Sequence, residues 1–81
     1  MHYWGVRMTH NELVASLLLL GWYRKEFNTF TAYGHPSAEA IEICDYPRDA
    51  ERYSLYFLDD EINDTNDPDE VMRWVKIKIN D

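Results

Sequence analysis

Residues 41–58, which read IEICDYPRDAERYSLYFL, decide the fold because two alternating segments are separated by a proline turn. Apolar side chains recur at every second position over residues 41–44 and again over residues 53–58, which is the spacing of a β-strand. Pro47 has no amide to give to a strand ladder, so the chain turns between the two segments. Such a short connection predicts that the two strands are antiparallel neighbours.

A further strand is expected upstream, between Trp22 and Tyr33. This segment is rich in aromatic and β-branched residues, and Gly34 and Pro36 end it. The strand over residues 53–58 carries large apolar groups on both faces, which favours a central position in the sheet. Three strands joined by short connections predict an antiparallel meander.

The first helix is predicted over Asn11–Leu20. Thr9 and Glu12 have the spacing of a capping box, in which each side chain accepts a hydrogen bond from the other residue's amide. Gly21 follows as the left-handed residue that commonly ends a helix. Residues 1–8, which include the aromatic Tyr3 and Trp4, are expected to pack against the domain as a strand or an ordered tail.

The second helix is predicted from Pro68 to about Val75. Asp67 is a suitable cap, and Pro68 stands at the first helical position, where no amide is needed. After Val75, the alternation of Ile77 with lysines fits a helix or a strand equally well. The predicted fold is therefore α+β: an N-terminal helix, a three-stranded antiparallel meander and a C-terminal helix, in the order α-β-β-β-α.

The chain of 81 residues has room for one core, so we expect residues 1–81 to form a single acidic domain. Cys44 is the only cysteine, which excludes an internal disulfide framework and favours a reducing, cytoplasmic setting. The longest apolar run is too short for a membrane span, so no membrane partner is expected.

The negative charge is concentrated in one segment. The net charge of the chain is −7, and residues 39–70 hold twelve Asp and Glu against two Arg. Such a surface repels phosphate backbones, so direct nucleic-acid binding is not expected. It suits a basic protein surface, above all one built to bind nucleic acid, because carboxylates can take the place of phosphates there.

The predicted element order resembles that of double-stranded RNA-binding domains, and the helix that ends at Gly21-Trp22 resembles small toxin proteins with the same topology. Those RNA-binding domains place lysines at the start of their last helix. This chain has Asp67, Asp69 and Glu70 there, so the resemblance extends to topology and not to RNA binding.

Several chemical sites were weighed. Residues 59–70 can be aligned with a twelve-position calcium loop, but Asp64 stands where the turn needs glycine and a strand, not a helix, leads in. None of the histidines, at positions 2, 10 and 35, is spaced to form a ligand pair with another histidine or with Cys44, and Cys44 has no activating basic neighbour in sequence. We therefore expect no enzyme activity, no cofactor and no bound metal.

The expected function is that of a small acidic binding protein that occupies a basic, nucleic-acid-binding surface of a protein partner. In size and charge the chain is similar to small acidic proteins by which bacteriophages block CRISPR or restriction complexes. The alternative is an interaction subunit that forms a homodimer through an apolar sheet face, its acidity serving solubility. The expected partner-binding residues are Glu42, Asp45, Asp49, Glu51, Tyr56, Asp59, Asp60, Glu61 and Asp64.

Overall fold

The protein is an antiparallel sheet with two helices, and the computed structural model describes residues 7–79. Tyr3 and Trp4, expected to pack against the domain, lie outside the described residues. None of the helices within residues 7–79 is long and apolar enough to cross a membrane. The elements are α1 (His10–Leu19), β1 (Tyr23–Glu26), β2 (Thr31–Gly34), β3 (Ile41–Asp45), β4 (Tyr53–Phe57), β5 (Asp60–Thr65) and α2 (Pro68–Ile79).

The first helix forms for the reasons that its sequence suggests. The Glu12 amide donates to Thr9 Oγ1 at 3.1 Å and the Thr9 amide donates to Glu12 Oε1 at 2.8 Å, so both halves of the capping box are present. At the other end Gly21 has a φ of 95°, which lets the Trp22 amide return to the Leu17 carbonyl.

The sheet has five strands in the order β1-β2-β3-β4-β5, all antiparallel, so the prediction of three strands was wrong. The segment from Trp22 to Tyr33 is a hairpin, β1 and β2, not one strand. Its turn is the two residues Asn28 and Thr29, closed by a hydrogen bond from the Phe27 amide to the Phe30 carbonyl. Without a glycine or proline, this turn has a weak sequence signal.

The fifth strand was also missed. Residues 60–65 read DEINDT, a polar stretch that favours a loop, yet they pair with β4 along its whole length. Tertiary pairing overrides the weak β-propensity of Asp and Asn here. Because β5 pairs beside it, β4 lies between two strands, as its apolar composition suggested.

The second helix begins at the predicted Pro68 and continues to Ile79, one turn beyond the predicted end at Val75. The Asp69 amide donates to Asp67 Oδ1 at 2.9 Å, which caps the helix. The alternating tail is therefore helical.

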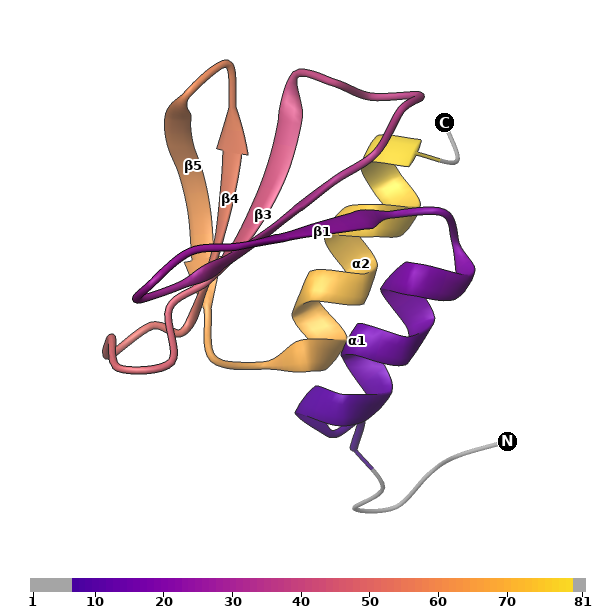
Figure 1. The fold of residues 1–81 in the computed structure, drawn as a ribbon. Helices are drawn as coiled ribbons and strands as arrows, with labels where there is room; N and C mark the ends of the chain where they lie inside the picture. Colours follow the sequence, from indigo (N-terminus) through magenta and orange to yellow (C-terminus); the bar gives the residue numbers. More distant parts are fainter. Residues whose placement is uncertain (1–6, 80–81) are drawn as a thin grey trace.

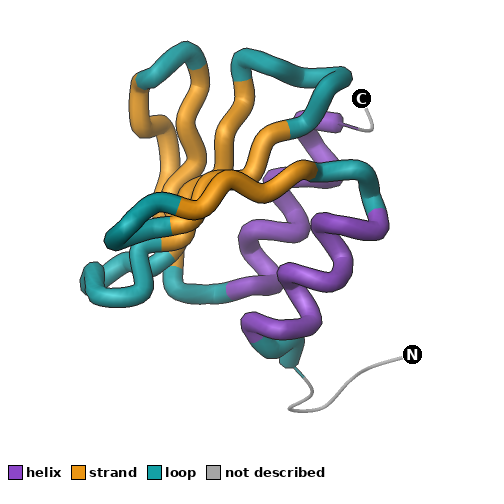
Figure 2. Tube along the Cα trace, in the orientation of Figure 1, coloured by secondary structure: helices purple, strands orange, loops and turns teal. Residues whose placement is uncertain are grey.

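Both helices cover the same face of the sheet, so the molecule has two layers (Figure 1). Figure 2 shows the helices gathered on one side and the strands on the other. The core between the layers contains Leu13, Leu17, Trp22, Tyr33, Ile41, Ile43, Tyr53, Leu55, Val71, Trp74 and Val75. Since side chains alternate along a strand, the neighbours of these sheet residues point to the other face.

We call this second face, which carries no helix, the open face. Its positions follow from the strand register, which forms two rows across the sheet. The open face contains Tyr23, Lys25, Ala32, Gly34, Glu42, Cys44, Ser54, Tyr56, Glu61 and Asp64.

Candidate functional site

The β4–β5 hairpin carries five of the expected partner-binding residues, Tyr56 on β4 and four carboxylates. Its two-residue turn is Leu58-Asp59, and both residues have positive φ, 51° and 72°. Such a turn matches the twist of a hairpin, but usually contains glycine or asparagine. Asp59 therefore lies at the tip and Asp60 opens β5, while Glu61 and Asp64 point to the open face.

The β3–β4 loop lies at the opposite end of the strands from the β4–β5 turn (Figure 1), and it brings Asp49 and Glu51 to the open-face carboxylates of β5. Asn66 holds this loop in place: its amide donates to the Ala50 carbonyl at 2.6 Å, and its Oδ1 accepts from the Arg52 amide at 2.7 Å. Because Asn66 directly follows β5, the loop is tied to the end of that strand. No local sequence pattern indicates this clamp.

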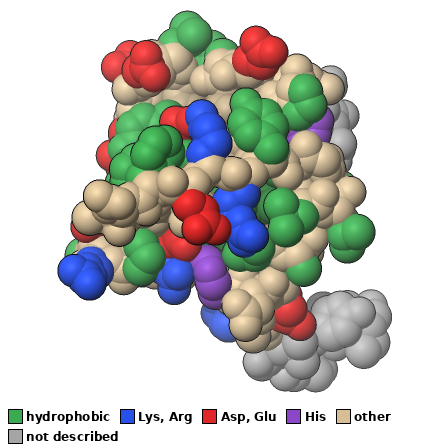
Figure 3. Space-filling model, viewed as in Figure 1, with side chains coloured by type: hydrophobic (Ala, Val, Ile, Leu, Met, Phe, Trp, Pro, Cys, Tyr) green, Lys and Arg blue, Asp and Glu red, His purple; other side chains and the backbone are tan. Residues whose placement is uncertain are grey.

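These two segments together form a surface that we call the acidic edge. All its carboxylates are exposed, and none takes part in an ion pair within residues 7–79. Figure 3 shows acidic side chains at the upper left of the view, where Figure 1 places the β4–β5 turn, which is one end of the acidic edge. The acidic edge consists of Asp49, Glu51, Asp59, Asp60, Glu61 and Asp64.

Two of the expected partner-binding residues form ion pairs within the chain itself. Lys25 Nζ donates to Glu42 Oε2 at 3.2 Å across the open face, so the charge of Glu42 is compensated. Asp45 points to the helix side and is only 4% exposed. Arg52 donates to both of its carboxylate oxygens, with Nη2 3.0 Å from Oδ2. Asp45 thus stabilises the interior instead of adding charge to the surface.

Tyr56, the one aromatic residue among the expected partner-binding residues, lies half-buried on the open face. Its hydroxyl is 3.1 Å from the Tyr46 hydroxyl. The Tyr46 ring lies 5.1 Å from the Phe30 ring, which stacks on Phe27 at 4.7 Å. Leu58 lies in the turn beyond the strand. We call Phe27, Phe30, Tyr46 and Tyr56 the aromatic row.

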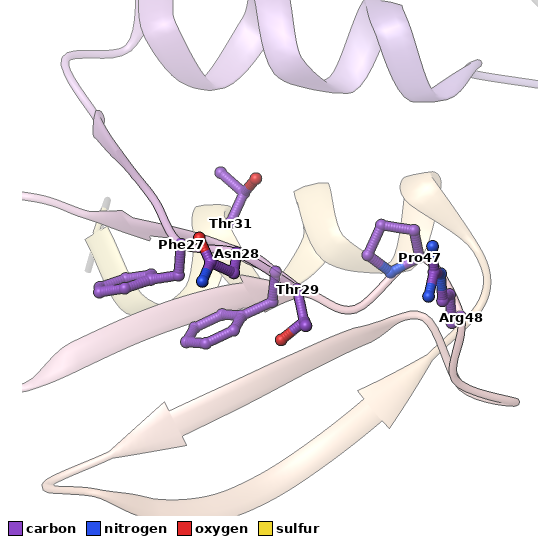
Figure 4. Close-up of a pocket in the computed structure, with 7 residues that line it drawn as sticks. Phe27, Asn28, Thr29, Thr31, Pro47 and Arg48 are labelled. Carbon is purple, nitrogen blue, oxygen red and sulfur yellow. The ribbon is translucent and has the colours of Figure 1, made fainter.

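Two hollows lie along the aromatic row. Figure 4 shows the first, of about 350 Å³, in which Phe27 and Thr29 lie across from Pro47 and Arg48. The second, which we call the acidic groove, measures about 500 Å³. It is lined by Tyr46, Arg48, Asp49, Ala50, Glu51, Ser54, Tyr56, Glu61 and Asp64. Five of the nine expected partner-binding residues therefore meet in one place.

A partly buried polar cluster was not foreseen from the sequence. His10 Nδ1 is 2.8 Å from the Tyr53 hydroxyl, and its Nε2 lies 3.4 Å from Arg52 Nη2 and 3.6 Å from Asp45 Oδ2. Burial lowers the pKa of His10, the nearby Arg52 charge lowers it further, and Asp45 opposes them. These residues lie far apart in sequence, so no motif could indicate the cluster.

Cys44 lies on the open face but is covered by its neighbours and is only 3% exposed. Burial raises the pKa of its thiol to about 11. At neutral pH the nucleophilic thiolate is therefore scarce, in line with the interpretation of Cys44 as a small strand residue.

The calcium-loop alternative does not fit the backbone. The β4–β5 register shifts between Leu55 and Tyr56, so Asn63, opposite Leu55, and Glu61, opposite Tyr56, point to opposite sides of the sheet instead of converging. Within residues 7–79, no three His, Cys, Asp or Glu side chains are grouped to hold a metal ion.

No protein-family model, curated protein or solved structure matches this chain. With five strands, the element order also departs from the α-β-β-β-α order of the double-stranded RNA-binding domains. The function must therefore be argued from the surface itself, which combines six uncompensated carboxylates with an aromatic row.

Proposed function

We propose that this chain is a binding protein that attaches to a basic surface of another protein through its acidic edge. The observation that supports the proposal is the distribution of ion pairs. Outside the acidic edge, five of the eight carboxylates within residues 7–79 have a cationic partner, namely Glu26, Glu42, Asp45, Asp67 and Glu70, whereas none of the six on the acidic edge has one.

Unpaired carboxylates on one edge repel one another, which opposes folding slightly and favours a cationic partner. A positive surface that meets this edge gains Coulomb energy and is guided to it during diffusion. Surfaces that bind nucleic acid carry such charge, because they neutralise phosphates with Lys and Arg. We therefore propose that the partner is a nucleic-acid-binding complex, which the chain inhibits by occupying its basic groove, as bacteriophage inhibitors of CRISPR or restriction complexes do.

A second role of the acidic edge concerns self-association. An edge strand offers unpaired backbone groups to other strands, and charged side chains on it oppose such pairing. β5 is an edge strand with exposed carboxylates, so protection of the edge alone would account for part of its charge. The test must therefore measure binding, not only charge.

The experiment is an affinity pull-down from host lysate with the tagged protein at low and high salt, read by mass spectrometry. Asp60→Lys and Asp64→Lys reverse charges on β5, and Glu26→Lys is the matched control on β1, the opposite edge of the sheet. We expect one nucleic-acid-binding complex that is lost at high salt and with either β5 variant, but retained with Glu26→Lys. Equal recovery with all variants would contradict the proposal.

Self-association is the second candidate function, and the exposed end of α1 favours it. Leu18, Leu19 and Leu20 are all exposed, and Leu19 reaches 87%. This apolar surface belongs to the helix layer, not to the sheet face expected for a homodimer. A dimer that persists in high salt and is lost in Leu19→Lys, measured by light scattering, would support this candidate; a monomer at all concentrations would exclude it.

A further inference from the structure

We propose that the open face receives an extended segment of the partner that carries arginine, with an arginine side chain seated in the acidic groove. This inference rests on the proposed function and deepens it. The proposed function requires only a basic partner, whereas the open face selects the kind of cation and the shape of the segment.

The open face combines aromatic side chains, which are typical of interfaces, with four charged residues, Lys25, Glu42, Glu61 and Asp64. The helices cover only the opposite face, and the aromatic row continues from the β1–β2 turn to β4. Phe27 is about half exposed although it stacks on Phe30. Tyrosine and phenylalanine are enriched at the centres of protein interfaces, where charged residues are depleted.

The acidic groove adds charge to one end of this row. Tyr46 and Tyr56 form an aromatic side, and Asp49, Glu51 and Glu61 are among the carboxylates around it. Arg48 supplies the one positive charge among the lining residues, so the groove has an excess of negative charge. A cation that enters it meets carboxylates and aromatic faces together.

This combination favours arginine over lysine. The planar guanidinium stacks on an aromatic ring while it donates two parallel hydrogen bonds to a carboxylate, whereas the ammonium group is a strongly hydrated point charge. The protein uses the same chemistry within its own fold. The Arg52 guanidinium lies 5.5 Å from the Tyr53 ring centre and binds both oxygens of Asp45.

The shape of the face favours an extended segment. Ala32, Cys44 and Ser54 form one row across the middle of the open face, and all three side chains are small and buried. Tyr46 and Tyr56 lie on either side of the Cys44–Ser54 end of this row, and their hydroxyls meet 3.1 Å apart across it. An extended chain is narrower than a helix of about 10 Å diameter and fits such a surface better.

The experiment compares two fluorescent nine-residue peptides, one alternating Gly with Arg and the other alternating Gly with Lys. The two peptides carry the same net charge. Their affinities are measured by fluorescence anisotropy at low salt. We expect the arginine peptide to bind about fivefold more tightly, the scale of one stacked guanidinium. Tyr56→Leu should remove this preference and leave the affinity for the lysine peptide nearly unchanged.

Two further variants test the contribution of the β5 charge and of the Tyr56 ring separately. Glu61→Gln with Asp64→Asn lies on an exposed strand and should weaken both peptides. Tyr56→Phe keeps the ring and should retain the preference, which separates stacking from the Tyr46 hydrogen bond. Circular dichroism confirms that each variant is folded.

The outcomes distinguish the inference from the proposed function. Equal affinity for both peptides, lost on neutralising Glu61 and Asp64, would overturn the arginine inference and leave the acidic-edge proposal standing. Binding of neither peptide would contradict both. An arginine preference that survives Tyr56→Leu would overturn the placement of the guanidinium in the acidic groove.

Discussion

The buried carboxylate of Asp45 provides the most direct test of how charge is used in this fold. We expect Asp45→Asn to destabilise the protein, because Arg52 would keep its charge and lose its counter-ion. Asp45 is 4% exposed and binds Arg52 through both oxygens. Removing one member of a buried ion pair typically costs about 3–5 kcal/mol.

The expected cost lies at the low end of that range. The Arg52 side chain is still 32% exposed, so water can solvate part of its charge in the variant. We therefore expect a loss of about 3 kcal/mol. For a domain of this size that corresponds to a fall of roughly 15 °C in Tm.

The assay is equilibrium unfolding in urea, followed by the fluorescence of the buried Trp22 and Trp74. Asp49→Asn is the matched control, because it makes the same chemical change four residues away on the exposed loop. We expect it to change stability by less than about 0.5 kcal/mol. Equal effects of the two substitutions, or none from Asp45→Asn, would refute the assignment of Asp45 to the interior.

Three further predictions follow from the same structure. Because burial and Arg52 lower the pKa of His10, its neutral form is favoured in the folded state, so its contribution to stability is fully present above the unfolded value of about 6.5 and is lost as the pH falls from there through the lower folded pKa. The fall in urea midpoint between pH 7.5 and 5.5 should therefore be smaller in His10→Gln, and an unchanged fall would contradict this. Cys44, with its thiol pKa raised to about 11 by burial, should react with a thiol probe at pH 7 much more slowly than the unfolded chain does; equal rates would show that it is accessible. Leu58→Gly should raise stability by about 0.5–1 kcal/mol in thermal unfolding, because Leu58 has positive φ and is 65% exposed, so strain is removed and little packing is lost; a lower Tm would mean that its side chain packs more than its exposure indicates.

Most errors in the sequence interpretation arose where tertiary pairing overrode local preference. The β5 segment has a composition typical of loops, and it becomes a strand only because β4 provides a partner for its backbone. The β1–β2 turn at Asn28-Thr29 has no glycine or proline, so the segment appeared as one long strand. Because β5 was not predicted, its acidic residues were assigned to a loop, whereas in the structure they line a sheet edge.

The candidate site was predicted in part. Charge segregation depends on composition alone, so the acidic residues of the β3–β4 loop and the β4–β5 hairpin could be selected from the sequence. The role of Asp45 could not, because its burial depends on strand register and on Arg52, seven positions away. The clamp of Asn66 on the β3–β4 loop joins segments that only the folded sheet brings together.

The sequence by itself determined the two helices, their caps, the antiparallel order of the central strands and the position of the charge. These features depend on contacts between residues a few positions apart, which a local pattern records directly. Only the tertiary structure decided which carboxylates are neutralised and which remain free on the acidic edge, and it alone formed the aromatic row. Both depend on contacts across strands, and strand pairing, not sequence proximity, chooses those neighbours.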